Sequence, residues 1–283
     1  DNCFSNFTSK KYPAQSASLI FLQFLRMEKK QRMFYTIIFA VILALYGLII
    51  GSFLNVCICR LPRKENIVTT RSHCMSCGYQ LKWYDLIPLF SWLALGGKCR
   101  RCKARISVQY PVVEALNGIL YLIVYWRFGF RVETLLYCLM ASALLALSVI
   151  DFRTFEIPAG FNVFIAGLGL VRVLTDLSNW KEYAIGFFVI SAPLYLLYMI
   201  TKGRGIGGGD IKLMAVGGLL LGWQCTILAF IVGCIIGSVI HVLRMKITKA
   251  DRVLAMGPYL SIGIYICALW GTQMLDWYLS FYR

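Results

Sequence analysis

The chain has 283 residues, of which 59% are hydrophobic, and its mean hydropathy is +0.69. Soluble globular proteins break up their apolar residues at helical or strand periods, whereas here they form long runs separated by short basic stretches. This pattern excludes an ordinary soluble domain and predicts an all-α polytopic membrane protein. The net charge of +16 does not indicate nucleic-acid binding, because the basic residues lie between apolar runs, where they set topology and meet anionic lipids.

Residues 1–32 are expected to form a polar and basic tail with one short apolar run, LIFLQFL. This run is too short to span a membrane, and most of its basic flank follows it, which is the wrong order for a signal peptide. Met27 and Met33 would each make a plausible start. We therefore interpret the tail as a possible extension and assign it no function.

Eight transmembrane helices are predicted after the tail. They cover residues 33–58, 111–128, 132–150, 160–177, 183–201, 211–223, 224–244 and 257–281. The sixth is short and rich in glycine, which favours a tilted or half-inserted helix. The predicted domains are the tail, a first helix (33–58), a loop domain (59–110) and a seven-helix membrane domain (111–283).

Lysine and arginine predict the orientation. The loop between the first two helices carries ten of them against two acids, Glu65 and Asp85. The positive-inside rule therefore places this loop in the cytoplasm, together with the loops at 151–159, 202–210 and 245–256. The basic tail favours the opposite orientation, and we follow the larger loop.

Two CxxC pairs lie in this loop, CMSC and CRRC, separated by residues 78–98. Four thiolates suit a tetrahedral structural Zn²⁺, and each pair lets one tight turn present two sulfurs. The predicted ligands are Cys74, Cys77, Cys99 and Cys102. Alternatives are two redox motifs, four unrelated cysteines, or His73 competing as a ligand. A loop with so little apolar content needs such a metal to hold it together.

Two acids are predicted at the cytoplasmic membrane edge. Asp151 ends the third span in LALSVIDFRTFEIP, and Asp210 follows the glycines of GRGIGGGDIKL. No strand or GxxxxGK[ST] pattern supports a phosphate loop. Two neighbouring carboxylates share a proton, so one can act as base and the other as acid on a water. The alternatives are a helix N-cap for Asp210 and pairing with Arg153 for Asp151. The glycines are expected to permit close backbone approach and positive φ.

Six motifs in order carry a resemblance to a known family. They are GSFLNVCICRLP, the paired CxxC knuckles with WYDLIPLFSWLALGGKCRRC, YPVVEALNG, IDFRTFEIP, GIGGGDIKL and MGPYLSIG, and they cover most of residues 45–262. In these motifs the chain resembles the prepilin peptidases, membrane aspartic proteases with a GxGD motif. It departs from them in its long tail and at Gly208, where many members carry a larger residue.

The resemblance implies that Asp151 and Asp210 are catalytic and that the four cysteines bind zinc. It implies cleavage of a basic leader after glycine in type IV prepilins or pseudopilins of pilus, secretion or competence systems. N-methylation from S-adenosyl-L-methionine would follow, with no methyl-donor residues identified. Apart from the resemblance, the candidate substrate-binding residues are Gly207, Gly209, Lys212 and Glu114, and an interfacial position without a substrate role is an equal alternative for Glu114. The expected location is a prokaryotic cytoplasmic membrane, with lipids as partners and no nucleic acid.

Three other functions remain open at this point. A preflagellin-type peptidase would lack methyltransferase activity, and the large cysteine loop disfavours it. An ion- or proton-coupled transporter would place carboxylates near mid-bilayer. A non-catalytic scaffold could use the zinc loop to grip a partner, but it leaves the glycine loop unexplained.

Overall fold

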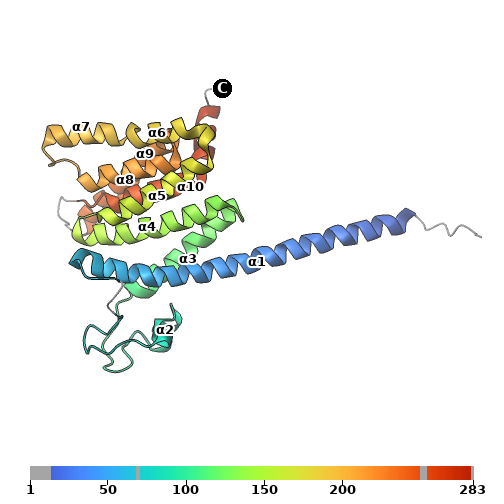
Figure 1. Cartoon of the computed structure of the whole chain (residues 1–283), viewed down its shortest axis with the longest axis horizontal. Helices are drawn as coiled ribbons and strands as arrows, with labels where there is room; N and C mark the ends of the chain where they lie inside the picture. The colour runs from blue at the N-terminus through green and yellow to red at the C-terminus, as the bar shows by residue number, and fades with distance from the viewer. Residues whose placement is uncertain (1–13, 68–70, 249–253, 282–283) are drawn as a thin grey trace, which may run out of the picture. The chain divides into compact units, whose positions relative to one another are not determined.

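A computed structural model describes residues 14–67, 71–248 and 254–281, without the side chains of 14–30 and 32 (Figure 1). Within these ranges the regular structure is helical, apart from two isolated β-bridges in the cysteine loop. Residues 1–13 of the predicted tail lie outside the described residues. The all-α prediction is therefore confirmed for the described chain.

The chain divides into two compact units at Leu43. Helix α1 runs over Ala14–Arg60, so it begins well before the predicted start at residue 33. The loop domain follows, with short 3₁₀ turns and α2 (Phe90–Ala94). The remaining helices are α3 (Gln109–Phe128), α4 (Val132–Thr154), α5 (Ala159–Thr175), α6 (Trp180–Val189), α7 (Ser191–Thr201), α8 (Gly208–Leu221), α9 (Trp223–Thr248) and α10 (Gly257–Ser280).

Helix α8 lies at the centre of the second unit. It packs against α5, α6, α7, α9 and α10, and Figure 1 shows it between α5 and α9. Leu213 and Met214 on α8 are fully buried. Gly218 meets Gly186 of α6 so closely that a side-chain carbon on either would overlap the other's backbone. Because protein surrounds α8, a length of 14 residues, about 21 Å, need not match the bilayer.

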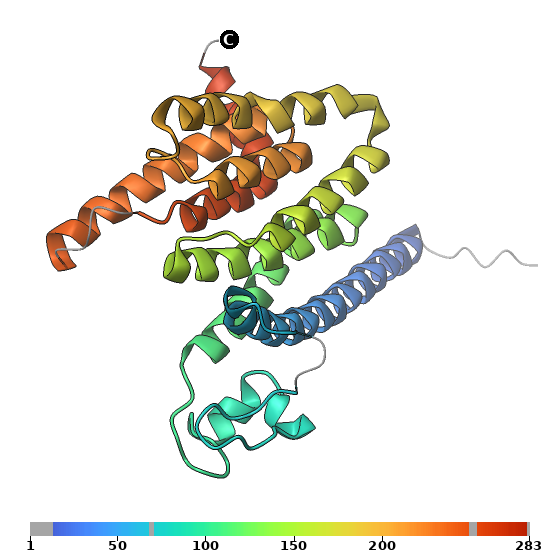
Figure 2. The ribbon, with the colours of Figure 1, turned by 60° about the vertical axis from the view of Figure 1, so that its left-hand side comes forward.

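The predicted fifth span is interrupted. The structure divides 183–201 into α6 and α7 at Ile190. Pro193, the third residue of α7, has no N–H and crowds the carbonyl four residues earlier, which breaks a continuous helix. The bend is visible along the top of Figure 2, where the chain passes from α5 into these two helices. We attribute the break to this proline.

Within the described ranges four segments are long and apolar enough to cross a membrane, so the chain is a multi-pass membrane protein. They are Met33–Arg63, Val132–Thr154, Leu177–Thr201 and Trp223–Ile247, and Ala159–Thr175 is a shorter apolar helix. Each of the eight predicted spans coincides with helical residues. The number eight stays a prediction, because α3, α8 and α10 do not meet the same criteria.

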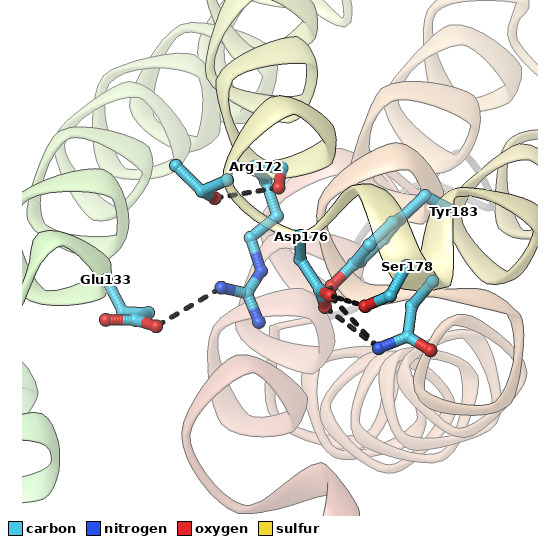
Figure 3. Close-up of polar contacts among 7 residues, drawn as sticks. Glu133, Arg172, Asp176, Ser178 and Tyr183 are labelled. Atoms are coloured by element: carbon cyan, nitrogen blue, oxygen red, sulfur yellow. Dashed lines mark hydrogen bonds and ion pairs between the residues drawn. The ribbon is translucent and has the colours of Figure 1, made fainter.

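A polar cluster joins α4, α5 and α6 at the end of α4 remote from Asp151 (Figure 3). Arg172 of α5 lies 3.4 Å from Glu133 of α4. Asp176 follows α5 and accepts hydrogen bonds from Asn179, Ser178 and, at 2.8 Å, the Tyr183 hydroxyl. This network fixes how the three helices meet, and the sequence analysis did not predict it.

Candidate active site and metal centre

A cavity of about 290 Å³ lies where the C-terminal end of α4 meets the N-terminal end of α8. It is lined by Asp151, Phe155, Glu156, Ile157, Ala159, Gly207, Gly208, Gly209, Asp210 and Lys212. Helix ends distant in the sequence thus bring the two predicted catalytic carboxylates to one cavity. Gly207, Gly209 and Lys212, three of the four predicted substrate-binding residues, lie there too.

Asp151 is held by the start of α10. Its side chain is buried, and Oδ2 accepts a hydrogen bond of 3.0 Å from the backbone N–H of Gly257. Gly257 is the first residue of α10, where backbone N–H groups have no intrahelical acceptor and the helix dipole favours negative charge. Within the described residues no ion pair joins Asp151 to Arg153. The alternative interpretation, in which Asp151 pairs with Arg153, is therefore wrong, and the backbone of Gly257 holds the carboxylate instead.

Asp210 lies in the first turn of α8, which begins at Gly208. The residue before the helix is Gly207, so the alternative interpretation of Asp210 as the N-cap is wrong. An acid in this turn is still favoured by the helix dipole. A side-chain carbon on Gly207 would lie 3.1 Å from Oδ2 of Asp210. The glycine backbone therefore lies directly against this carboxylate.

The glycines act by close approach more than by positive φ. Of the five glycines in 203–209, only Gly203 has φ in the left-handed region, at 76°. The expectation of positive φ is thus wrong for the others. A side-chain carbon on Gly209 would lie 3.0 Å from Ile157, whereas one on Gly208 would have nothing within 4 Å. The need for glycine is therefore steric at Gly209, and space is open at Gly208.

Glu114, the fourth predicted substrate-binding residue, is not among the residues that line this cavity. It is buried on α3, and its Oε2 accepts a hydrogen bond of 2.8 Å from the backbone N–H of Leu89. The polar contacts that the sequence analysis missed include Glu156 on the cavity wall and the backbone N–H of Gly257 behind Asp151. Both fall inside recognised motifs, IDFRTFEIP and MGPYLSIG, but only a folded chain shows what they face.

The four predicted zinc ligands come together in the loop domain. The sulfurs of Cys74, Cys77, Cys99 and Cys102 all lie within 4.8 Å of one another. This donor set fits a tetrahedral structural Zn²⁺ with no open position. His73 is exposed and its Nδ1 lies 3.1 Å from the Arg71 carbonyl, outside the cluster.

The two cysteine pairs adopt the same turn. In each, the residue after the second cysteine has positive φ, 69° at Gly78 and 61° at Lys103. Its N–H donates to the carbonyl of the first cysteine, at 2.9 Å for Cys74 and 3.0 Å for Cys99. A backbone hydrogen bond from Ser76 lowers the pKa of Cys74 to about 6. The turn thus favours the thiolate that a metal requires.

Comparison with known proteins finds relatives and family models that match most of this chain. A family model described as Bacterial Peptidase A24 N-terminal domain matches residues 45–128, and one described as Type IV leader peptidase family matches residues 138–242. Proteins named prepilin leader peptidase/N-methyltransferase are 34% identical in Stutzerimonas stutzeri and 33% in Pseudomonas aeruginosa, over 84% of this chain and 92% of each relative. One from Myxococcus xanthus is 36% identical over 75% of this chain and 64% of its own length.

No solved structure matches the chain. The two family models cover the loop domain with its cysteine cluster and the helices that carry both cavity aspartates. The chain therefore belongs to the type IV leader peptidase family.

Proposed function

We propose that the protein is a membrane-embedded aspartic endopeptidase that removes the basic leader of type IV prepilins or pseudopilins after glycine. The N-terminus exposed by cleavage is then methylated. The observation that carries the peptidase proposal is the shared cavity, in which Asp151 and Asp210 face the same space from two helix ends. Membership of the leader peptidase family supports both activities.

In the proposed reaction a water binds between the two carboxylates. One carboxylate takes a proton from the water as it attacks the scissile carbonyl, and the other gives a proton to the leaving amine. The N–H of Gly257 fixes the orientation of Asp151. The open space at Gly208 leaves room for an extended substrate backbone with glycine at the cut, beside Gly207, Gly209 and Lys212.

The proposed topology has eight spans, with the loop domain (59–110), the cavity and both helix ends at the cytoplasmic face. A prepilin has a basic leader in the cytoplasm followed by an apolar helix, so its scissile bond lies at this depth. Anionic lipids hold enzyme and leader on the same surface. The large exposed apolar side chains along α1 and α9 support a lipid-facing position for these helices.

The four-cysteine cluster would hold Zn²⁺ as a structural ion, because all four positions are filled by thiolates. When bound, the metal supplies a fixed link between the two CxxC turns. The methyl donor is proposed to be S-adenosyl-L-methionine, on the strength of family membership. We assign none of the chain's residues to that donor.

Co-expression with a candidate prepilin tests the proposal, reading leader loss and N-terminal mass together. Asp151→Asn and Asp210→Asn should each abolish cleavage while the protein remains inserted in the membrane. Asp276→Asn is the matched control, because Asp276 is exposed near the C-terminal end of α10 and does not line the cavity. If either cavity variant kept more than about 10% of activity, the loss would be below ~1.4 kcal/mol and the paired-carboxylate mechanism would be wrong.

A further inference from the structure

One segment of the loop domain differs from everything around it. Residues 87–97, IPLFSWLALGG, contain no charged side chain, although the loop as a whole is strongly basic. Phe90 and Leu93 are each 65% exposed, and their spacing places them on one face of α2. Leu86 and Ile87, which precede α2 in the chain, are exposed as well. An exposed apolar patch indicates a surface that is covered in use.

The exposure of this patch does not come from a loose loop. The Gly97 N–H donates to the Trp92 carbonyl at 2.8 Å, and the Ile106 N–H donates to the Gly97 carbonyl at 2.7 Å. Trp92 turns inward, with its ring against Gly97 and its Nε1 donating to Ile106 at 3.4 Å. The fold therefore partly buries Trp92 and presents Phe90 and Leu93 outward.

The segment is also fixed to the side of α3. The Leu89 N–H donates to Oε2 of buried Glu114, which lies five residues past the start of α3, about 7.5 Å along its axis. Helix α1 packs closely against α3 at the same position, because a side-chain carbon on Gly51 would lie 2.7 Å from the Glu114 Cα. If α3 crosses the bilayer as proposed, the segment lies beside the helix at the level of the lipid headgroups.

Cations surround the segment. Exposed basic residues precede and follow it, at Lys82, Lys98, Arg100, Arg101, Lys103 and Arg105. The nearest acid in the sequence, Asp85, is buried and paired with Arg100 at 2.8 Å. Glu114, which accepts the hydrogen bond from Leu89, is buried as well. An apolar face flanked by cations is the pattern of a segment that lies in the interface of an anionic membrane.

We propose that residues 87–97 form an interfacial anchor, which inserts Phe90 and Leu93 between the headgroups and acyl chains of an anionic leaflet. The flanking cations bind lipid phosphates. The anchor holds the cysteine cluster at a fixed height above the membrane, beside the helix ends that carry Asp151 and Asp210. This inference rests on the proposed topology of α1 and α3, and it does not depend on the catalytic roles of the two aspartates.

The test uses the full chain, reconstituted in phosphatidylcholine vesicles with or without phosphatidylglycerol. An environment-sensitive fluorescent amino acid replaces Phe90, and the lipids carry a nitroxide below the headgroup. The matched control replaces Met75, which is 72% exposed and apolar but lies in a cysteine turn. We expect blue-shifted emission and loss of fluorescence to the nitroxide at position 90, greater with phosphatidylglycerol, and water-like emission at position 75.

Equal quenching at the two positions, or none at position 90, would overturn the anchor. Indifference to phosphatidylglycerol would overturn the role of the cations. A photo-crosslinking amino acid at Leu93 identifies the occupant: acyl-chain adducts support the anchor, whereas adducts with a second copy of the chain or with prepilin overturn it. Leader cleavage is measured on the same vesicles. A labelled enzyme that is active but not quenched at position 90 refutes the anchor alone. Quenching at position 90 together with an inactive wild-type enzyme in the same kind of vesicle refutes the proposed function alone.

Discussion

Replacing Gly257 by alanine tests how Asp151 is held. The added carbon would lie 2.6 Å from Oδ2 and 3.0 Å from Cγ of Asp151, whereas ordinary contacts begin near 3.4 Å. Asp151 is buried and the free space beside it is the cavity that it lines, so a carboxylate pushed by the added carbon turns towards that cavity and away from the Gly257 N–H. The carboxylate or the start of α10 must therefore move by about 0.8 Å, the difference between 3.4 and 2.6 Å.

Two estimates of the effect of Gly257→Ala on the activation free energy agree. A hydrogen bond to a charged group contributes about 1.5–3 kcal/mol, and the displacement of Asp151 breaks its hydrogen bond with the Gly257 N–H. A misplacement near 1 Å in an active site costs about 100-fold in rate, or roughly 2.7 kcal/mol. We therefore expect the cleavage rate of Gly257→Ala to fall about 100-fold. Helix α10 itself should not be weakened, because alanine is the better helix former by up to about 1 kcal/mol.

Gly160→Ala is the matched control. Gly160 is the second residue of α5 and does not line the cavity, and a side-chain carbon there meets nothing within 4 Å. Initial rates of leader removal are compared for both variants in detergent or vesicles, at equal amounts of inserted protein. The expectation is wrong if Gly257→Ala keeps more than about a tenth of the wild-type rate, a loss below ~1.4 kcal/mol, or if Gly160→Ala loses as much.

Three further outcomes are expected. In metal-free protein near pH 7, an alkylating reagent should modify Cys74 before Cys102, although Cys102 is the more exposed. A backbone hydrogen bond from Ser76 lowers the pKa of Cys74 to about 6, whereas at Cys102 the lowering effect of the bond from Ala104 is outweighed by the other thiols and by burial, which raise its pKa to about 11. Peptide mass spectrometry that finds Cys102 modified first would contradict this expectation. Asp151→Asn should block methylation of full prepilin yet allow methylation of pilin that is supplied already cleaved, because methyl transfer needs only a free amine and a bound donor. The mass of the pilin N-terminus is measured. If the wild type does not methylate cleaved pilin, the protein is a peptidase without methyltransferase activity. The cleavage rate should fall on both sides of a pH optimum, because one carboxylate must be protonated and the other ionised, and a rate that rises to a plateau would exclude this division of roles.

The sequence predicted the features that depend on local spacing. Two CxxC pairs were enough to predict a four-sulfur cluster, because each turn is short and self-contained. The apolar runs locate the helix ends, and each helix end sets the position of its residues relative to the membrane surface. Asp151 and Asp210 were therefore predicted to lie at the same membrane edge. Both predictions used only periodicity, charge and residue chemistry, and the geometry agrees with them.

Long-range contacts could not be predicted in this way. In the sequence Gly257 is a glycine at the start of a helix, and nothing in its spacing indicates that its N–H donates to Asp151. Glu114 was predicted at the substrate, but it accepts from Leu89 of the loop domain, a contact that no spacing rule reveals. The Pro193 break had a visible signal, since a proline in an apolar run interrupts backbone hydrogen bonding, but the hydropathy of the run concealed it.

The site is assembled from the ends of three helices, α4, α8 and α10, so its geometry depends on how far each helix extends along the bundle axis. A slip of one residue moves a helix end by about 1.5 Å, more than an active site tolerates. The Glu133–Arg172 pair at the other end of α4, about 27 Å from Asp151, limits such a slip between α4 and α5. Since helices tilt to match the hydrocarbon thickness around them, we expect the rate of leader cleavage to vary with the acyl-chain length of the surrounding lipids.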